Sequence, residues 1–421
     1  MKLLLSAYSC EPGKGSESGV GWHWAEELSA LGYDVWVLTR SNNREPIEEA
    51  LDAQPARANL NFIYYDLPKW ASWWKIGGHF VRFYYLLWQI GAYQAVKRAH
   101  RDIGFDAVHH LTFGTVRQPS FLGGLGVPFI FGPAGGGERA PWPLRRGYGV
   151  GGWLADLTRD VLNGFIKYDP TMRLTYRQAH RIYLKSPQSR DPIPREWQDK
   201  ARCHFEMGID PPEGPEEDTA PAEAPGLRVL YVGRFLYWKG MHLGLQAFAS
   251  FLSVDPNARL TLVGKGKSEA LWRRQARRLG IADHIDWVPW VEQNELGALY
   301  RRHDVFLFPS LHEASGNVVL EALAHGLPVV CLDLGGPALI VNESCGRVIP
   351  TTDRSRAAVV GDLVAALTEL RREADTRQRL SQGARARVAT MTWRAQVEQL
   401  YRDAFGAPPV ERPARERALS S

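Results

Sequence analysis

The feature that most constrains this sequence is an alternation of short apolar segments with amphipathic helical segments, present once in each half of the chain. In the first half a helix is expected at Gly19–Leu31. The expected strands of this half are Lys2–Tyr8, Val35–Thr39, Phe62–Tyr65, Ala107–His110 and Phe129–Phe131. Apolar strands that alternate with helices are typical of parallel sheets covered on both faces. We therefore expect a doubly wound α/β domain here.

The same pattern restarts after an acidic, proline-rich segment at 207–226, which has the composition of a linker. The expected strands of the second half are Arg228–Val232, Arg259–Val263, Ile285–Val288, Val305–Phe308 and Val329–Leu332. The expected helices are His242–Leu252, Glu269–Leu279, Glu295–Arg301 and Val318–His325. Two such α/β domains place a ligand crevice at the carboxyl ends of their strands.

Length and composition agree with this plan. The chain has 421 residues, of which 45% are apolar and 23% charged, and its net charge of +5 is too small to indicate nucleic acid binding. Four separate cysteines without a CxxC pair predict a reducing cytoplasm, with no disulfide and no zinc site. The apolar run after Met1 is too short for a signal peptide, so we expect a buried first strand. The expected parts are an N-terminal domain at 1–206, the linker at 207–226, a C-terminal domain at 227–391, an amphipathic helix at 392–405 that packs back across the first half, and a disordered tail at 406–421.

A basic loop follows the first strand of the second half. It reads Gly233-Arg234-Phe235-Leu236-Tyr237-Trp238-Lys239-Gly240. Its glycines allow a ligand to approach the backbone, and its two cations suit a diphosphate. The alternative is a surface turn whose cations are solvated. A second glycine-rich turn, at Gly264, follows the next strand but lacks the pattern of a Walker loop.

Two glutamates, Glu313 and Glu321, stand eight positions apart around the start of a helix. The backbone N–H groups of Gly316, Asn317 and Val318 begin that helix and favour a phosphate or a sugar hydroxyl. Glu321 lies further along the helix, where a buried carboxylate needs a partner such as a ribose diol. The alternative is an ordinary capped helix with one solvated glutamate.

Taken in order, the segments GRF…KG, VGxG, PS…E-x7-E and GxPVV resemble the retaining glycosyltransferases of family 4, the group 1 glycosyl transferases. The resemblance covers nearly the whole chain and implies a GT-B fold of two Rossmann-like domains that face an inter-domain crevice. It implies a nucleotide-sugar donor, UDP- or GDP-linked, and no further cofactor. The implied catalytic residues are Arg234, Lys239 and Glu313. The implied donor-binding residues are Gly15, Ser16, Gly233, Gly264, Gly316, Asn317, Val318 and Glu321.

The first domain departs from that family in one place and the second domain in another. Many members carry a histidine where this chain has Gly132–Glu138, and Ala314-Ser315 replaces the usual Gly-Phe. Both departures concern the acceptor and the transferred sugar. On the acceptor side we expect His109, His110 and Glu138, with buried structural histidines as the alternative for the first two.

The sequence favours metal-independent chemistry, because no DxD pair follows a strand of the first half and no ligand cluster has metal spacing. Arg234 and Lys239 can instead stabilise the charge on a departing diphosphate. Transfer with retention is implied by the resemblance alone. The alternatives are a nucleotide-sugar epimerase, a phosphorylase with a pyridoxal lysine, and a non-catalytic scaffold that kept the fold.

A basic and aromatic stretch at 69–101 contains no acidic residue. Interleaved cations and aromatic rings favour a helix on an anionic membrane surface, and we expect peripheral association with the inner face of the cell membrane and a lipid-linked acceptor. The alternatives are a helix buried against the first sheet with its cations in solvent, and a nucleic acid site, which the donor motifs disfavour.

Overall fold

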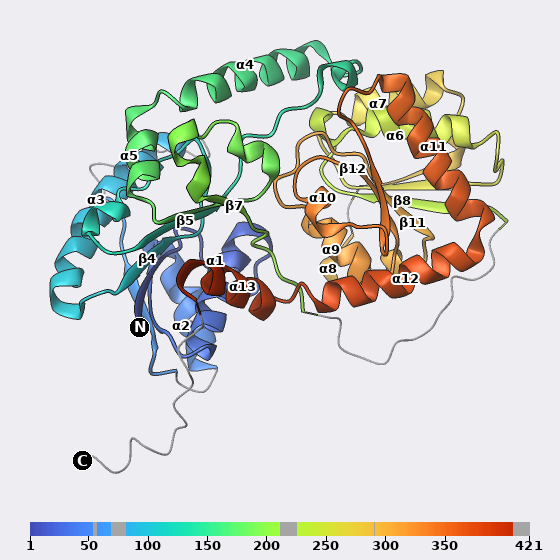
Figure 1. Cartoon of the computed structure of the whole chain (residues 1–421). Helices are drawn as coiled ribbons and strands as arrows, with labels where there is room; N and C mark the ends of the chain where they lie inside the picture. The colour runs from blue at the N-terminus through green and yellow to red at the C-terminus, as the bar shows by residue number, and fades with distance from the viewer. Residues whose placement is uncertain (54–56, 69–80, 211–224, 290, 407–421) are drawn as a thin grey trace. The chain divides into compact units, whose positions relative to one another are not determined.

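The computed structural model describes residues 1–53, 57–68, 81–210, 225–289 and 291–406, and the chain divides into two compact units (Figure 1). The first unit contains Met1–Gly137, Asn163–Gly208 and the C-terminal segment from Trp393. The second unit contains Glu138–Leu162 and Ile209–Thr392. Most of the segment predicted to be a linker and nearly all of the predicted tail lie outside the described residues.

The first unit is built on a seven-stranded parallel sheet in the order β3-β2-β1-β4-β5-β6-β7. The strands are β1 (Lys2–Ser6), β2 (Asp34–Thr39), β3 (Leu60–Tyr64), β4 (Ala107–His110), β5 (Phe129–Ala134), β6 (Arg181–Leu184) and β7 (Ala201–Cys203). The chain moves from β1 outward to β3 and then returns to place β4 on the other side of β1. The strand order therefore reverses between β1 and β4.

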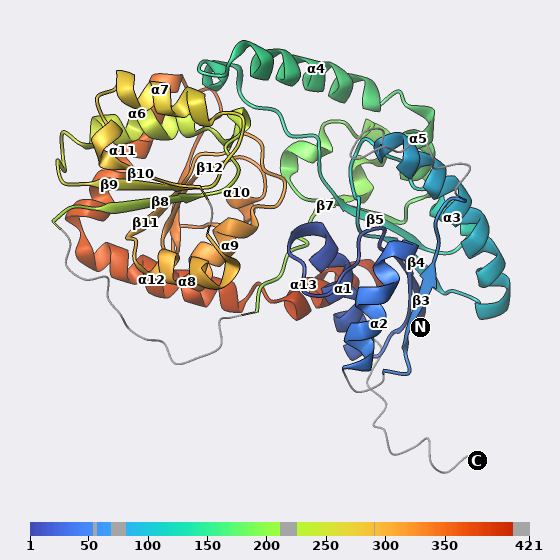
Figure 2. The same ribbon diagram turned by 180° about the vertical axis from the view of Figure 1, so that it is seen from behind.

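Helices cover both faces of this sheet, as the continuous apolar strands predicted. They are α1 (Ser16–Ala30), α2 (Arg44–Asp52), α3 (Val81–Ile103), α5 (Pro170–Gln178) and α13 (Trp393–Phe405). Figure 2 shows α1, α2 and α13 on one face and α3 with α5 on the other. The amphipathic helix expected at 392–405 is α13, and it packs against α1. Pro170 begins α5 behind Asp169, whose carboxylate accepts hydrogen bonds from the first two free backbone N–H groups.

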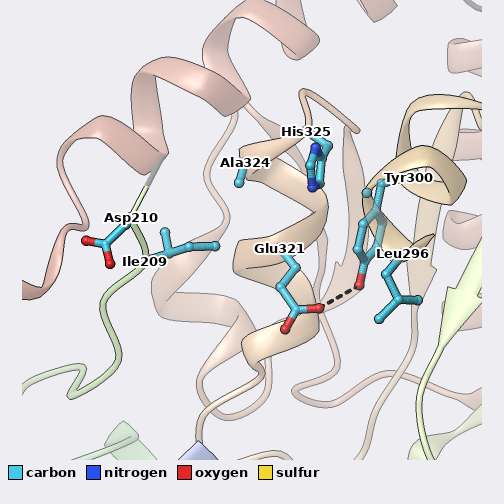
Figure 3. A pocket seen from close by; sticks show the side chains of 8 residues that line it. Ile209, Asp210, Leu296, Tyr300, Glu321, Ala324 and His325 are labelled. Atoms are coloured by element: carbon cyan, nitrogen blue, oxygen red, sulfur yellow. Dashed lines mark hydrogen bonds between the residues drawn. The ribbon is translucent and has the colours of Figure 1, made fainter. Parts of the chain in front are cut away.

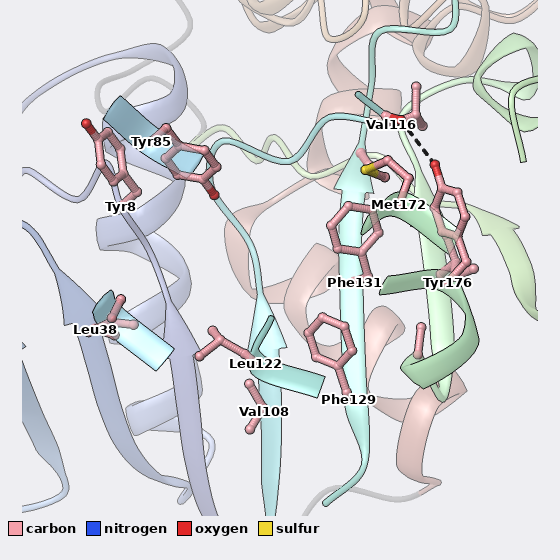
Figure 4. Close-up of a cluster of buried hydrophobic side chains, with 14 of the residues drawn as sticks. Tyr8, Leu38, Tyr85, Val108, Val116, Leu122, Phe129, Phe131, Met172 and Tyr176 are labelled. Carbon is pink, nitrogen blue, oxygen red and sulfur yellow. Dashed lines mark hydrogen bonds between the residues drawn. The ribbon is translucent and has the colours of Figure 1, made fainter. Parts of the chain in front are cut away.

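One core cluster of the first unit lies between its sheet and the helices α3 and α5 (Figure 4). Phe129 and Phe131 point from β5 toward Met172 and Tyr176 of α5, and all four side chains are fully buried. The Tyr176 hydroxyl keeps a partner in this apolar setting by donating to the Val116 carbonyl at 3.2 Å. Complete burial of one such apolar side chain contributes about 1.5–3 kcal/mol.

The same core corrects the prediction that 69–101 is a membrane surface, for the part of it that the structure describes. Tyr84, Tyr85 and Trp88 of α3 are buried in the core, while the cations of this helix are exposed. The described part of 69–101 is thus the alternative considered above, a helix buried against the first sheet. Among the side chains of α3 that the structure describes, Phe83 and Ile90 are the exposed large apolar ones. Residues 69–80, which include Trp73, Trp74 and Lys75, lie outside the described residues.

The second unit repeats the plan with a six-stranded parallel sheet in the order β10-β9-β8-β11-β12-β13. The strands are β8 (Arg228–Val232), β9 (Arg259–Val263), β10 (Ile285–Val288), β11 (Val305–Phe308), β12 (Val329–Leu332) and β13 (Gly346–Ile349). The helices are α6 (Met241–Phe251), α7 (Glu269–Arg278), α8 (Gln293–Arg301), α9 (Asn317–Ala324), α10 (Pro337–Ile340), α11 (Arg356–Arg372) and α12 (Ala374–Ala389). Figure 1 shows α6, α7 and α11 on one face of this sheet and α8, α9 and α12 on the other. Here the strand order reverses between β8 and β11.

One segment joins the unit that the sequence did not assign it to. Glu138–Leu162, expected in the N-terminal domain at 1–206, clusters with the second unit and includes most of α4 (Val150–Ile166). The reason is a set of buried polar contacts from this segment to the second unit, such as the hydrogen bond between His242 Nε2 and the Leu144 carbonyl at 2.8 Å. Within the described residues, no helix has the length and hydropathy needed to cross a bilayer.

Candidate active site

The candidate site lies in the second unit, where the strand order reverses. In a doubly wound sheet, the loops that leave the two strands on either side of the reversal diverge and leave room for a ligand. The strands here are β8 and β11, and the loops that follow them are residues 233–240 and 309–316. These two loops contain all three predicted catalytic residues, Arg234, Lys239 and Glu313.

Lys239 and Glu313 form an ion pair in which the lysine ammonium donates to the Glu313 carboxylate. The side chains are only 14% and 19% exposed, so solvent screens this pair weakly. The ammonium also lies 5.1 Å from the centre of the Phe308 ring, at the end of β11. The two predicted catalytic groups, 74 positions apart in the sequence, are therefore direct neighbours.

Backbone contacts fix the positions of both loops. The Leu311 N–H donates to the Trp238 carbonyl at 2.8 Å, which ties the loop after β11 to the residue before Lys239. Gly240 has a φ of +68°, and a Cβ at this position would lie 1.8 Å from the Pro309 carbonyl oxygen. Only glycine fits such an approach. On the other side, the Gly336 N–H donates to the Glu313 carbonyl at 2.8 Å.

Arg234 is exposed, and its guanidinium forms no ion pair with any described residue. Its loop is held by Gly233, whose N–H donates to the Val263 carbonyl at 3.0 Å. Gly264 follows Val263 with a φ of +135°, and a Cβ there would meet the Gly233 carbonyl oxygen at 2.1 Å. The two predicted glycines thus pack backbone against backbone beneath an exposed arginine.

Helix α9 begins directly after the loop that carries Glu313. Its first residues are the predicted Asn317 and Val318, and Gly316 precedes them as the N-cap with a φ of +90°. Glu321 follows one turn after Asn317 and therefore lies on the same side of the helix. The predicted donor-binding residues of this segment are thus presented by a single helical turn.

Glu321 lines a pocket within the second unit, and its carboxylate accepts a hydrogen bond from the Tyr300 hydroxyl at 3.0 Å (Figure 3). The other lining residues are Ile209, Asp210, Leu296, Gly297, Ala324 and His325. Burial and the nearby Glu321 raise the pKa of Tyr300 well above its ordinary value, so the phenol remains a donor. The sequence predicted that Glu321 needs a partner but did not identify Tyr300, which stands on a separate helix, α8.

A buried polar cluster behind the two loops was not predicted. Asp156 of α4 is fully buried and bonds His312 Nε2 at 3.0 Å and the Tyr237 hydroxyl at 3.4 Å. Because a carboxylate only accepts, His312 Nε2 carries the proton. Burial by itself raises the pKa of Asp156, but the hydrogen bond from His312 and the charge of Arg145 outweigh burial and lower it below its ordinary value. The Asp156 carboxylate thus contacts His312, which precedes Glu313, and Tyr237, which stands two positions before Lys239.

Asp156 carried no sequence signal because it lies 156 positions before His312. His312 directly precedes the motif residue Glu313, and this position was the only sign of the cluster in the sequence. Arg145 completes the cluster from the same segment, with its guanidinium 2.7 Å from Asp160 and 3.6 Å from Asp156.

Gly15 and Ser16 belong to the first unit, at its own strand reversal. Gly15 is the N-cap of α1, and Ser16 has a φ of +59°, a conformation that glycine adopts without strain. The Glu17 carboxylate accepts a hydrogen bond from the Phe113 N–H and so links this turn to the segment after β4. The turn therefore holds Ser16 in a backbone conformation that usually favours glycine.

The structure corrects the acceptor-side predictions for His109 and His110. His109 is completely buried and His110 almost completely. His109 forms hydrogen bonds with the Tyr401 hydroxyl at 2.8 Å and with the Gly132 carbonyl at 2.6 Å. His110 forms one with the Tyr85 hydroxyl at 3.1 Å. Burial lowers the pKa of His109 to about 4 and that of His110 to about 3. These are structural histidines. The third residue, Glu138, is also buried and begins the segment that joins the second unit.

Comparison with known proteins supports the fold and the family resemblance. Residues 218–387 match the model of the family described as glycosyl transferases group 1. The D-inositol 3-phosphate glycosyltransferase of Segniliparus rotundus is 30% identical over 244 residues, which are 55% of this chain and 50% of that protein. The chain spans about half the length of the curated relatives it matches.

Two solved structures show the same fold at low sequence identity. Sucrose-phosphate synthase of Thermosynechococcus elongatus has a TM-score of 0.59 at 19% identity and covers 96% of this chain and 99% of its own. HepE of Anabaena, solved in complex with UDP, has a TM-score of 0.56 at 15% identity and covers 96% and 99%. The predicted fold class is therefore confirmed: the chain has two Rossmann-like parallel-sheet domains, as GT-B glycosyltransferases do. The family match encloses Arg234, Lys239, Glu313 and Glu321.

Proposed function

We propose that this protein is a retaining, metal-independent glycosyltransferase that moves a hexose from a nucleotide-diphosphate donor to a saccharide acceptor. The observation that carries the proposal is the Lys239–Glu313 pair at the strand reversal of the second unit, inside the region that matches the group 1 family. A cation next to a carboxylate, at the mouth of a doubly wound sheet, suits a ligand with a diphosphate at one end and hydroxyls at the other.

In this proposal each site residue has one role. Arg234 and Lys239 bind the diphosphate. Glu321 accepts hydrogen bonds from the ribose hydroxyls, and the Tyr300 hydroxyl orients the Glu321 carboxylate. Glu313 and the backbone at Gly316 contact the transferred sugar. Gly15 and Ser16 of the first unit supply backbone N–H groups to the donor.

The reaction breaks the bond between the anomeric carbon and the diphosphate oxygen and forms a bond from that carbon to the acceptor oxygen on the same face. The acceptor hydroxyl loses its proton to the departing phosphate oxygen, so no separate base is needed. The charge that develops on the diphosphate is stabilised by Lys239 and Arg234. Among the described residues, no group of three or more His, Cys, Asp or Glu side chains is arranged to share a metal ion.

The donor is UDP- or GDP-linked in this proposal. HepE, which shares the fold, was solved with UDP, and this motivates UDP as the first donor to test. The residues that follow Glu313 are Ala314 and Ser315, so the sugar preference is expected to depend on this small, polar turn. The acceptor is proposed to be a lipid-linked saccharide reached from the cytoplasmic face of a membrane.

The test is a thermal unfolding panel with UDP-, GDP-, ADP- and dTDP-glucose, followed by product analysis. A donor present at 100 times its Kd stabilises the native state by about 2.7 kcal/mol, so the matching nucleotide should stand out. Incubation with the matching donor should release free nucleotide only when an acceptor is supplied. Conversion of the sugar without an acceptor would identify an epimerase, and the absence of any stabilisation or turnover would contradict the proposal.

A further inference from the structure

Among the described residues, helix α4 carries more exposed large apolar side chains than any other helix. Val150, Trp153, Leu154, Val161 and Leu162 are between 41% and 81% exposed, and Trp142, just before the helix, is 56% exposed. On an α-helix, Val150, Leu154 and Val161 fall on one side, because they are spaced by four and seven residues. We call these six residues the outer face of α4. Monomeric proteins rarely expose such a continuous apolar strip without a partner.

The opposite side of α4 explains why the outer face is free of negative charge. Residues 139–168 contain only two acids, Asp156 and Asp160. Asp156 is fully buried against His312, and Asp160 is bound by Arg145 at 2.7 Å. Both acids are thus neutralised by partners inside the second unit.

The charges that remain at the surface of this segment are positive. Arg139, Arg146 and Lys167 are exposed, and Arg159 is half-buried over the ring of Trp238. Trp142 and Trp153 contact each other edge to face with ring centres 6.0 Å apart, and both present indoles to solvent. An apolar strip with exposed indoles and flanking cations has the chemistry of a helix that lies in a membrane interface.

We propose that the outer face of α4 docks this protein on an anionic lipid surface. The 17-residue helix lies parallel to the surface with its apolar side among the acyl chains. Arg139, Arg146 and Lys167 contact the lipid headgroups, where an anionic leaflet attracts them. This membrane surface differs from the one predicted at 69–101, and it stands whether or not the proposed transfer reaction is correct.

The test is vesicle co-sedimentation of the full chain with phosphatidylglycerol vesicles and with phosphatidylcholine vesicles. We expect binding to the anionic vesicles that is about tenfold tighter or more than to the neutral ones and that weakens with salt. The double variant Leu154→Glu/Val161→Glu should lose about tenfold or more of that binding. The two side chains are 54% and 51% exposed, so the unfolding temperature of the variant should stay close to the wild-type value, which separates docking from folding.

The matched control is Phe83→Glu/Ile90→Glu, which adds the same charges to exposed positions of α3 and should bind vesicles as the wild type does. Equal vesicle binding by the α4 variant and the wild type would overturn the proposal, as would the absence of anionic vesicle binding by the wild type. Loss of binding in the α3 variant alone would place the membrane contact on α3. Self-association in light scattering that the α4 variant removes, without vesicle binding, would show that a second copy covers this face.

Discussion

The two units of this protein share a doubly wound plan but differ at the point where the strand order reverses. In the first unit, the strand beside the reversal ends in His109 and His110, which are buried, neutral and bonded to the fold itself. In the second unit, the corresponding strands end in loops that carry Arg234, Lys239 and Glu313, all at least partly exposed. The same topology thus holds a closed polar network in one unit and an open, charged one in the other.

This difference separates polar groups that serve the fold from polar groups that serve a ligand. The histidines of the first unit have partners inside the protein, and burial lowers their pKa values, which keeps them uncharged. The cations of the second unit are solvated or paired across loops, where a diphosphate can compete for them. Substitutions of the charged loop residues in the second unit should therefore affect turnover, and substitutions of the buried histidines in the first should affect stability.

The largest effect is expected for Lys239→Ala. Loss of the ammonium removes the group that stabilises charge on the departing diphosphate, so kcat should fall by about 10²–10³-fold. The measurement is steady-state release of free nucleotide from the donor. Arg278→Ala, which removes an exposed cation at the end of α7, should keep the wild-type rate. Unchanged turnover in the Lys239 variant would show that the second unit's open network is not catalytic.

A smaller effect, on donor binding, is expected for Glu321→Ala. A charge-assisted hydrogen bond contributes about 1.5–3 kcal/mol, so the KM for the donor should rise by roughly 10–100-fold with kcat nearly unchanged. Tyr300→Phe removes only the hydroxyl that orients the Glu321 carboxylate, so it should raise the KM for the donor by a smaller factor. If kcat fell while KM stayed constant, Glu321 would act on the transition state and the assignment to ribose would be wrong.

Asp156→Asn probes the cluster behind the second unit's loops. This change keeps the shape of the side chain but leaves Arg145 without one of its two anions, so the free energy of unfolding should fall by about 3 kcal/mol. We also expect kcat to fall by about tenfold, because the hydrogen bonds to His312 and Tyr237 position the neighbours of Glu313 and Lys239.

The matched control is Asp160→Asn, which removes the other carboxylate bound to Arg145 but touches neither His312 nor Tyr237 in the structure. It should lower stability and leave kcat at the wild-type value. If both variants lost only stability, Asp156 would be structural and would not position the loops of Lys239 and Glu313.

The pH dependence of stability tests the buried histidines. His109, His110 and His204 belong to the first unit, and His242, whose pKa burial lowers to about 4, belongs to the second. Burial lowers the pKa of His109 and His204 to about 4 and that of His110 to about 3, while the unfolded values lie near 6.5. Below pH 6.5 the unfolded chain takes up protons that the native state refuses, so stability is lost as the pH falls from 6.5 toward 4. Each histidine contributes about 1.4 kcal/mol per pH unit in this window.

Urea unfolding at pH 7.5 and pH 5.5 should show this loss as a lower midpoint at the acid pH. His110→Gln cannot take up a proton and should make the difference between the two midpoints smaller. Asp156 cannot mimic the effect, because its lowered pKa makes its contribution fall only below about pH 4. If the midpoint fell by the same amount between the two pH values in His110→Gln and in the wild type, the first unit would have to open to solvent at this histidine.

The sequence predicted the two sheets and the position of the charged loops because both follow from local patterns. Alternating apolar strands define the sheets, and Arg234, Lys239 and Glu313 all stand in loops that follow predicted strands. The contacts that the sequence missed are all distant in the chain: Asp156 with His312, Tyr300 with Glu321, and His109 with Tyr401. Local patterns also misassigned the aromatic rings of α3, since a buried helix and a membrane helix have the same composition.

The smallest effect concerns how each unit builds its turns at the reversal. The second unit uses Gly240 for a left-handed residue, whereas the first unit uses Ser16 and Phe113, with φ values of +59° and +58°. A non-glycine residue in this conformation costs about 1–2 kcal/mol. Ser16→Gly should therefore raise the free energy of unfolding by about 1 kcal/mol or less, since glycine also loses more entropy on folding.

The measurement is urea unfolding at neutral pH, and Gly240→Ala is the opposite change in the other unit. That variant should be strongly destabilised, because its Cβ would collide with the Pro309 carbonyl. A Ser16→Gly protein that is less stable than the wild type would show that the serine hydroxyl outweighs the strain. The donor KM of this variant then tests whether the strained turn serves donor binding. A looser turn should bind the donor less tightly if Gly15 and Ser16 hold the diphosphate.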